Sequence, residues 1–509
     1  MMKRSPNILI FNPDQWRGDV MGHLGNPAAL TPNLDQLVAE DAISFRNAFV
    51  QATVCTPSRC SYMTGWYPHV FGHRTMHHML HDRQADANLL RVLKDNGYFI
   101  WWGGKNDLIP GQNGYEADCD VSFRPSRSDY ERWGYEPQQD AHIGNQAWRG
   151  DPESDNYYSF FKGRLETGDQ ALHFDPDWAM VYGAIDFLNS YEGDQPLCIF
   201  LPLGFPHPPY CVEEPWFSAI DRNNLPERTQ LQSLDEKPAL LRGIRENQHL
   251  STWDEDRWSE LRATYYGMCA RVDHQFGLVK QALVDSSRYD DTAIFIFSDH
   301  GDFTGDYGLV EKTQNTLEDC LCNVPLIIKP PSNAEVVAGT RDQLVELVDF
   351  PATVYEMAGI DPGHWHFGKS LVGQLTSTDK PHRDAVFCEG GRLRNERQAS
   401  EYESQKLSGE LGLYSPRISL QIGEEDSFTH SKATMCRTDR YKYIRRLYEQ
   451  DELYDLLNDP GETENLITSE THQKIRLELI ERMLLWYQET CDIVPMRSDQ
   501  RFFMRQQKS

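Results

Sequence analysis

The sequence predicts an α/β fold, with a large, mixed but mostly parallel sheet sandwiched by helices and a smaller C-terminal α+β subdomain on a short antiparallel sheet. Three apolar runs, at residues 7–12, 197–203 and 293–297, predict the large sheet. They lack the alternation of a half-buried strand, which is typical of strands covered on both faces. Segments with helical apolar spacing lie between the runs, and this succession favours a parallel sheet.

The other elements follow in chain order. Further strands are predicted at 43–49, 98–102, 324–328 and 344–349, and helices from Thr31, over 87–96, 178–191 and 258–284, and through 355–359. After a linker at 368–381, short strands are predicted at 385–388 and 441–444, and a terminal helix at 475–486. A chain of 509 residues exceeds the size at which one hydrophobic core stops growing. We therefore expect a large domain over 1–380 and a subdomain over 381–509.

Charge and hydropathy limit the function classes. Lys and Arg number 50 against 77 Asp and Glu, a formal net charge of −27, which argues against nucleic acid or an anionic membrane as a partner. An anionic substrate would need a local cluster of cations. No window approaches the roughly 18 apolar residues of a membrane helix. The eleven cysteines lack paired spacing, and no apolar segment follows the first residues, so we expect reduced thiols and a cytoplasmic protein.

Residues 54–65 contain the strongest candidate for chemistry. Pro57 suits a first helical turn, and Ser58 is a plausible N-terminal cap. A helix N-terminus presents unpaired N–H groups and partial positive charge, so Cys55 and Arg59 would face a site for an oxyanion. For an isolated cysteine the ordinary alternative is a buried thiol beside a turn.

Candidate metal ligands follow two of the predicted buried strands. Asp14 and Gln15 come directly after the first strand, and Asp299 and His300 come after the strand at 293–297. Carboxyl ends of parallel strands can meet at one edge of a sheet. Carboxylate and amide oxygens suit Ca²⁺, Mg²⁺ or Mn²⁺. The alternative is that these acids cap helices.

Other polar residues are candidates for substrate contacts. Lys105 follows the strand at 98–102, and His207 lies rigidly between prolines, as a general acid should. The histidine-rich stretch 69–81 lacks the ligand spacing of a zinc site. Within it, His73 and Arg74 are either substrate contacts or residues of a plain surface loop.

The string Cys55-Thr56-Pro57-Ser58-Arg59, followed by Thr64-Gly65, resembles the sulfatase signature C-x-P-S-R-x-x-x-x-T-G. In type I sulfatases of the alkaline phosphatase superfamily this cysteine is oxidised to formylglycine. The segments Pro206-His207-Pro208-Pro209 and Ser298-Asp299-His300-Gly301 are similar to further sulfatase motifs, so the resemblance covers nearly the whole chain. It implies an alkaline phosphatase-like fold and a formylglycine-generating maturation enzyme as a partner.

The resemblance also implies roles for single residues. Cys55 would be the formylglycine precursor and a metal ligand beside Asp14, Asp299 and His300, with Arg59 as its stabiliser. Lys105 and Lys312 would bind sulfate, and His207 would be the acid or leaving-group contact. The metal is expected to be Ca²⁺, with Mn²⁺ or Mg²⁺ as alternatives.

The chain departs from the common sulfatase pattern at two places, and the first, Asp14-Gln15, resembles the phosphonate monoester hydrolase and choline sulfatase branches. Many sulfatases have two consecutive Asp where this chain has Asp14-Gln15, so Gln15 either ligates weakly or only orients its neighbours. Asp107 stands where many sulfatases have a sulfate-binding His, and it would contact a substrate hydroxyl or brace a cation.

The expected activity is hydrolysis of a sulfate monoester, with a sulfated sugar as the first guess and an aryl or small alkyl ester as the second. The alternatives are a phosphonate or phosphate ester hydrolase of the same superfamily, or a catalytically silent binder of sulfated glycans if Cys55 stays unmodified. Homo-oligomer formation stays open.

Overall fold

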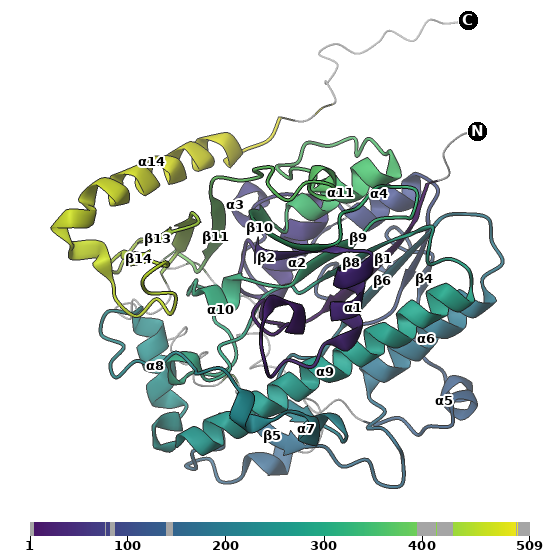
Figure 1. Ribbon diagram of the computed structural model, residues 1–509, viewed down its shortest axis with the longest axis horizontal. Coiled ribbons are helices and arrows are strands. Elements are labelled where there is room, and N and C mark those ends of the chain that lie inside the picture. Colours follow the sequence, from purple (N-terminus) through teal and green to yellow (C-terminus); the bar gives the residue numbers. More distant parts are fainter. Residues whose placement is uncertain are drawn as a thin grey trace, which may run out of the picture.

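A sheet of eight strands forms the centre of the computed structural model, which describes residues 5–76, 78–81, 87–138, 146–393, 396, 414, 431–494 and 496 (Figure 1). The strand order is β10-β2-β9-β8-β1-β6-β3-β4. The strands are β1 (Asn7–Pro13), β2 (Ile43–Phe49), β3 (Phe99–Trp102), β4 (Val121–Ser122), β6 (Leu197–Leu203), β8 (Thr292–Phe297), β9 (Leu326–Lys329) and β10 (Gly339–Glu346).

The sheet is mixed but mostly parallel, as predicted. Strand β1 lies between β6 and β8 and runs parallel to both, with Ile8 opposite Cys198 and Ala293. Strand β9 is antiparallel to its two neighbours β2 and β8. The carboxyl ends of β1, β6 and β8 therefore meet at one edge.

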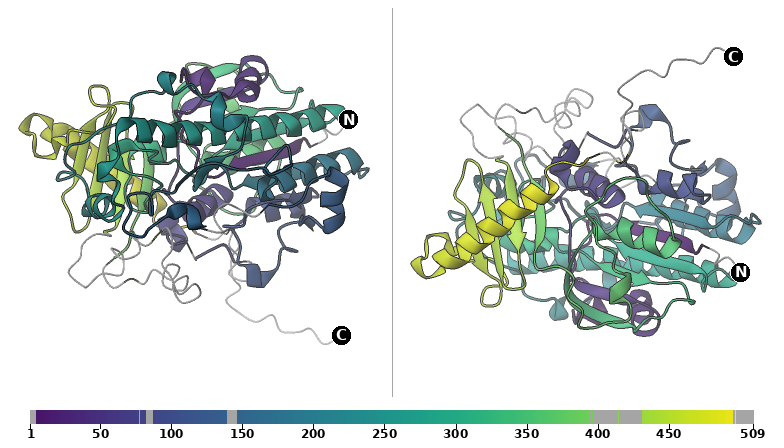
Figure 2. Two further views of the ribbon diagram at one scale, coloured as in Figure 1. Left: turned by 90° about the horizontal axis from the view of Figure 1, so that it is seen from below. Right: turned by 90° about the horizontal axis from the view of Figure 1, so that it is seen from above.

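Helices cover both faces of this sheet, because successive residues of the buried strands point to opposite sides. Ile8 and Ile10 pack in the core beneath α2 (Cys55–Thr64), α4 (Leu89–Asp95) and α11 (Asp349–Ala358). Leu9 and Phe11 pack in the second core beneath α1 (Pro32–Glu40), α6 (Pro176–Ser190) and α9 (Glu255–Asp285). Helices α6 and α9 run side by side along that face (Figures 1 and 2).

A second, antiparallel sheet lies at one end of the molecule (Figure 2). Its order is β11 (Val386–Gly390), β12 (Ala433–Arg437), β13 (Tyr441–Arg446) and β14 (Glu452–Asp455). The terminal helix α14 (Gln473–Thr490) packs on it, with the Trp486 ring stacked on Phe387 at 4.5 Å between centroids. The α+β subdomain is present as predicted, whereas the boundary between 1–380 and 381–509 stays a prediction. Most of the predicted polar segment 391–430 lies outside the described residues.

Shorter elements connect these layers. They are α3 (Pro68–Phe71), α5 (Arg127–Trp133), β5 (Phe161–Arg164), β7 (Tyr210–Val212), α7 (Trp216–Ala219), α8 (Ala239–Asn247) and α10 (Asp319–Cys322). Strands β5 and β7 pair in parallel as a separate two-stranded sheet. Across the ranges that the structure describes, no helix has the length and apolar character needed to cross a membrane.

Some predicted boundaries were wrong. Helix α2 begins at Cys55 with Val54 as its N-cap, so Ser58 lies inside the helix and is not the cap. Its hydroxyl instead donates to the Asp299 carbonyl at 2.5 Å. The strand predicted at 344–349 is β10, which begins at Gly339 and ends at Glu346, and Asp349 already belongs to α11. Gly65 ends α2 with φ 74°, a left-handed conformation that glycine adopts without strain.

Candidate active site

Four predicted ligand residues converge where β1 and β8 end and α2 begins. Asp14 follows β1, Asp299 and His300 follow β8, and Cys55 is the first residue of α2. All four are buried, and one ligand atom from each lies within 4.8 Å of the others. Two carboxylates and an imidazole are suitable donors for a divalent cation, and an oxygen in place of the Cys55 sulfur would make the set oxygen-rich. The residues therefore fit the metal that the sequence predicts.

Cys55 lies at the centre of this group. Its Sγ is 3.2 Å from His300 Nε2, 3.7 Å from Asp14 Oδ1 and 3.7 Å from Lys105 Nζ. Burial, followed by the charge of Asp14, raises the pKa of the Cys55 thiol. Burial lowers the pKa of His300, which favours the neutral imidazole that can ligate a metal.

Arg59 bridges the two carboxylates. One helical turn after Cys55, its Nε donates to Asp299 Oδ2 at 2.9 Å and its Nη2 to Asp14 Oδ2 at 3.0 Å. Burial alone would raise the pKa of Asp14, but the charges of Lys105 and Arg59 outweigh it and hold this pKa well below its usual range. The Asp14 carboxylate is therefore ionised and fixed in position.

Lys105 reaches the same carboxylate from the end of β3. Its Nζ is 2.5 Å from Asp14 Oδ2 and 3.0 Å from Asp107 Oδ2. The ion pair of Asp107 with Lys105 favours the predicted role of bracing a cation. A contact between Asp107 and a substrate hydroxyl stays a prediction.

His207 and Lys312 face each other beside this group. His207 Nδ1 donates to the Pro208 carbonyl at 2.6 Å, and its Nε2 lies 3.1 Å from Lys312 Nζ. Lys312 also donates to Gln15 Oε1 at 2.7 Å and to Glu311 Oε1 at 2.6 Å. The lysine and the imidazole are therefore held at a fixed separation.

Gln15 orients its neighbours through both ends of its amide. Its Nε2 donates to Asp302 Oδ2 at 2.5 Å, while its Oε1 accepts from Lys312. The amide is therefore engaged with two side chains, which favours the orienting role over ligation. Weak ligation of the metal by Gln15 stays a prediction.

His73 and Arg74 pack on their own loop and on the C-terminal subdomain. His73 Nδ1 donates to the His78 carbonyl at 3.1 Å, and Arg74 forms an ion pair with Glu396 and donates to the Gly391 carbonyl at 3.3 Å. Gln314 Nε2 donates to the Arg74 carbonyl at 2.8 Å, so this loop lies next to the segment that carries Lys312. Substrate contacts of His73 and Arg74 stay predictions.

Sequence reasoning missed the side chains behind the site. The Tyr210 hydroxyl donates to Asp302 Oδ1 at 2.8 Å and accepts the Glu311 N–H at 2.8 Å. Asp302 follows the predicted ligands by two residues, and Glu311 directly precedes Lys312. Their adjacency to predicted site residues was the available signal, whereas nothing in the sequence pointed to Tyr210.

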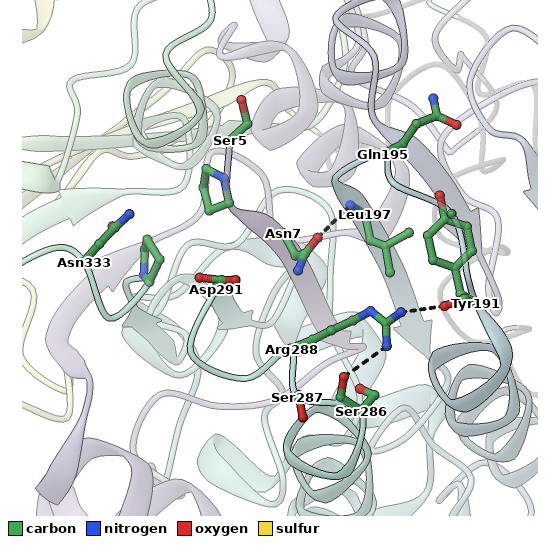
Figure 3. A pocket seen from close by; sticks show the side chains of 13 residues that line it. Ser5, Asn7, Tyr191, Gln195, Leu197, Ser286, Ser287, Arg288, Asp291 and Asn333 are labelled. Atoms are coloured by element: carbon green, nitrogen blue, oxygen red, sulfur yellow. Dashed lines mark hydrogen bonds between the residues drawn. The ribbon is translucent and has the colours of Figure 1, made fainter. Parts of the chain in front are cut away.

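A cavity of about 280 Å³ lies at the opposite edge of the sheet (Figure 3). Asn7 and Leu197, at the amino ends of β1 and β6, line it with Arg288. Arg288 donates to backbone carbonyls of Leu188, Tyr191 and Ser286. The guanidinium therefore supports the surrounding loops, and the cavity is separate from the ligand cluster at the carboxyl ends.

Solved structures place the chain in a fold class. The phosphonate monoester hydrolase of Agrobacterium radiobacter matches with a TM-score of 0.71 and 22% identity, covering 95% of this chain and 96% of that one. A structure in complex with its substrate D-glucosamine-2-N,6-O-disulfate matches with a TM-score of 0.62 and 17% identity, covering 96% and 98%. The chain is an α/β protein of the alkaline phosphatase-like fold.

The particular family follows from sequence. The family model described as Sulfatase matches residues 6–360, and the chain belongs to that family. The multifunctional alkaline phosphatase superfamily protein PehA of Trinickia caryophylli is 24% identical over 94% of this chain and 95% of its own length. An arylsulfatase of Clostridium perfringens is 24% identical over 94% of each chain. The resemblance seen in the motifs is confirmed, and the family supports an enzyme of the sulfuric ester hydrolase class.

Proposed function

We propose that this protein hydrolyses a sulfate monoester with a formylglycine made from Cys55 and a divalent cation. The observation that carries the proposal is the buried convergence of Asp14, Cys55, Asp299 and His300 within 4.8 Å. The family signature around Cys55 adds the reason why this cysteine would be modified. Chemistry on sulfur needs a nucleophile, cations for the non-bridging oxygens, and help for the departing alcohol.

Asp14, Asp299, His300 and the modified residue 55 would hold the cation, with Ca²⁺ as the first candidate and Mn²⁺ or Mg²⁺ as alternatives. When bound, the cation supplies positive charge beside the sulfate oxygens and position 55. Arg59 keeps both carboxylates in place through its two hydrogen bonds. Removal of this guanidinium would leave two buried like charges without their shared partner.

Cys55 needs a formylglycine-generating maturation enzyme to become active. A hydrated formylglycine supplies two hydroxyls on one carbon, one that can attack sulfur and one that can release the sulfate again. The position of Cys55 at the first turn of α2 supports this role, because the helix N-terminus favours negative charge at that point.

Lys105 and Lys312 bind the sulfate oxygens, and His207 transfers a proton to the departing alcohol or donates a hydrogen bond to it. Lys105 lies 3.7 Å from Cys55 Sγ, and Lys312 lies 3.1 Å from His207 Nε2. Lys105 thus lies beside residue 55 and Lys312 beside His207. This arrangement supports attack on sulfur from residue 55 and departure of the alcohol on the side of His207. Positioned imidazole is the most common donor to a leaving oxygen.

The alcohol is a sugar hydroxyl, with aryl and small alkyl sulfates as second candidates. Support comes from the similar structure whose substrate is D-glucosamine-2-N,6-O-disulfate. Asp107 and the pair His73 and Arg74 are the candidates for contacts to the remainder of the substrate.

A phosphonate monoester is the second candidate substrate class. Its support is the likeness to the phosphonate monoester hydrolase, together with Asp14-Gln15 and Asp299-His300, which resemble that branch. A phosphonate monoester carries one negative charge, as a sulfate monoester does, so the same cations serve both.

A substrate panel tests the proposal. Protein produced together with a maturation enzyme and supplied with Ca²⁺ is assayed on 4-nitrophenyl sulfate, on glucosamine sulfates and on a 4-nitrophenyl phosphonate. We expect the highest kcat/KM on a sulfate ester. A preference of more than tenfold for the phosphonate would replace the proposal with the second substrate class. Hydrolysis of neither the sulfate esters nor the phosphonate would favour the third alternative, a catalytically silent binder of sulfated glycans.

A further inference from the structure

The loop that carries His207 is held from behind by a carboxylate of α6. Asp177 Oδ1 accepts the Gly204 N–H at 2.7 Å, and Asp177 Oδ2 accepts the Phe205 N–H at 2.8 Å. The Gly204 carbonyl in turn accepts the His207 N–H at 2.9 Å. Two hydrogen bonds in series therefore link the Asp177 carboxylate to the backbone of His207.

A buried arginine of α9 fixes the same loop from a second side. Arg271 is fully buried, and its guanidinium carbon lies 4.2 Å from the centroid of the Phe205 ring. Its Nη2 donates to Asp175 Oδ1 at 2.6 Å, and its Nη1 to Glu213 Oε2 at 3.3 Å. Because Asp175 is the N-cap of α6, this arginine ties α9 to the turn of α6 that contains Asp177.

We propose that Asp177 is a positioning residue for His207, with Arg271 and Phe205 completing the support. This inference rests on the proposed function, in which His207 assists the departing alcohol. Such assistance depends on placing the imidazole to within about 0.5 Å of the leaving oxygen. Asp177 contacts the loop backbone through both carboxylate oxygens, so it fixes the loop in two directions at once.

The chain contains a matched control for Asp177. Asp273 is also buried and also binds two consecutive backbone N–H groups, those of Asn33 at 3.2 Å and Leu34 at 2.9 Å. It secures the start of α1 instead of the His207 loop. Asp273→Asn therefore reports the general effect of weakening such a carboxylate clamp.

The test measures kcat/KM for aryl sulfates whose phenols differ in pKa, using matured, Ca²⁺-supplied protein. The variants are His207→Ala, Asp177→Asn, the double variant and Asp273→Asn. Asparagine keeps an acceptor for one N–H but turns an NH₂ group toward the other. We expect Asp177→Asn to lower kcat/KM about 10- to 100-fold for phenols that are poor leaving groups, which is part of the contribution of a general acid. For 4-nitrophenol, a good leaving group that needs little protonation, the expected loss is less than about threefold. The double variant should be no slower than His207→Ala.

Several results would overturn the inference. One is an equal loss on all substrates in Asp177→Asn, and another is additive losses in the double variant. A steeper leaving-group dependence in Asp273→Asn would also contradict it. If His207→Ala itself leaves this dependence unchanged, there is no imidazole role to support, and the inference falls while sulfate hydrolysis stands. Absence of sulfate release by the matured wild type would instead overturn the proposed function. If Asp177→Asn does not fold, Phe205→Leu takes its place, with an expected loss of about threefold to tenfold confined to poor leaving groups.

Discussion

Two buried clusters of ions invite comparison, because only one has the character of an active site. The first, here called the catalytic cluster, contains Asp14, Cys55, Arg59, Lys105, Asp299 and His300 at the carboxyl edge of the large sheet. The second, here called the seam cluster, joins α10 to the small antiparallel sheet and comprises Asp319, Arg437, Lys442, Arg446, Glu452 and Glu462. Both clusters are ion-paired and mostly buried; the exceptions are Lys105 and Asp319, whose side chains are 29% and 25% exposed.

The two clusters differ in what their carboxylates face. In the seam cluster, Lys442 Nζ lies 2.5 Å from Asp319 Oδ1 and 2.8 Å from Glu462 Oε1, and Arg446 Nε lies 2.6 Å from Glu452 Oε1. In the catalytic cluster, two carboxylates also converge on an imidazole and a cysteine. Among the residues that the structure describes, only this group places three or more metal-type ligand atoms within 4.8 Å of one another. Convergence of ligands, and not buried charge alone, distinguishes a site from a structural cluster.

The largest expected effect is the loss of turnover when Cys55 is replaced, compared with replacement of another buried cysteine. Cys55→Ala should lower turnover of 4-nitrophenyl sulfate by about 10⁴-fold or more, because it removes the nucleophile. Cys198→Ala, near the start of β6, is the control and should keep the turnover. The Cys198 thiol is also fully buried, and burial raises its pKa. Full turnover by folded, metal-supplied Cys55→Ala would contradict the assignment.

The next effect concerns the metal. Asp299→Asn should lower kcat/KM about 10³-fold, the equivalent of several kcal/mol of charge stabilisation. It should also abolish the rise in Tm that Ca²⁺ gives to the chelator-treated wild type, since binding to the folded state alone stabilises it. Glu462→Gln changes a buried carboxylate of the seam cluster and should keep the Ca²⁺-dependent rise. Retention of that rise in Asp299→Asn would remove Asp299 from the ligand set.

Replacing a lysine of each cluster should affect different properties, activity in one variant and stability in the other. Lys105→Met should lower kcat/KM about 10²-fold with little change in Tm, because it removes one cation from the sulfate site. Lys442→Met should keep the activity per folded molecule but lose about 3–5 kcal/mol of stability, because it leaves the Glu462 carboxylate buried without the lysine that it pairs with, while Asp319 keeps its ion pair with Arg437. Urea unfolding and steady-state kinetics on both variants check this. Similar losses of activity in both would erase the distinction between the clusters.

The smallest effect is a pH dependence of stability that comes from Asp349, a buried carboxylate of α11 outside both clusters. Burial alone would raise the pKa of Asp349, but the charge and hydrogen bonds of Arg383, with His382, outweigh it and hold this pKa well below its usual range. A depressed pKa contributes stability that is present above the unfolded pKa of about 4 and is lost as the pH falls below it. The free energy of unfolding should therefore fall from pH 5 to pH 3, and less steeply in Asp349→Asn. Equal slopes in the two proteins would contradict the ion pair.

Sequence reasoning found the catalytic cluster and missed the seam cluster for one physical reason. Asp14, Cys55 and Asp299 each stand beside a local pattern, either a buried apolar strand or a signature string. Lys442 lies within the predicted strand at 441–444, and Glu462 lies in the segment after β14. Both are buried in the fold, where Lys442 Nζ donates to Glu462 and to the Leu317 carbonyl. Burial of a charge through long-range contacts leaves no local signal.

The same limit explains the errors and omissions around the site. Ser58 was expected to cap α2 because serine favours that position, but the helix starts three residues earlier and the hydroxyl bonds to Asp299. Asp177 lies on α6, far in sequence from the loop that it holds. Side chains that act on backbone N–H groups of a distant segment are visible only once the fold is known.

The most direct test of the central claim is the mass of the tryptic peptide that contains residue 55, from protein produced together with a maturation enzyme. We predict a loss of about 18 Da relative to cysteine, which corresponds to the aldehyde and differs from the gains of ordinary thiol oxidation. The modified fraction should scale with the rate of sulfate release across preparations. An intact Cys55 thiol in protein that hydrolyses sulfate esters at full rate would contradict the formylglycine mechanism.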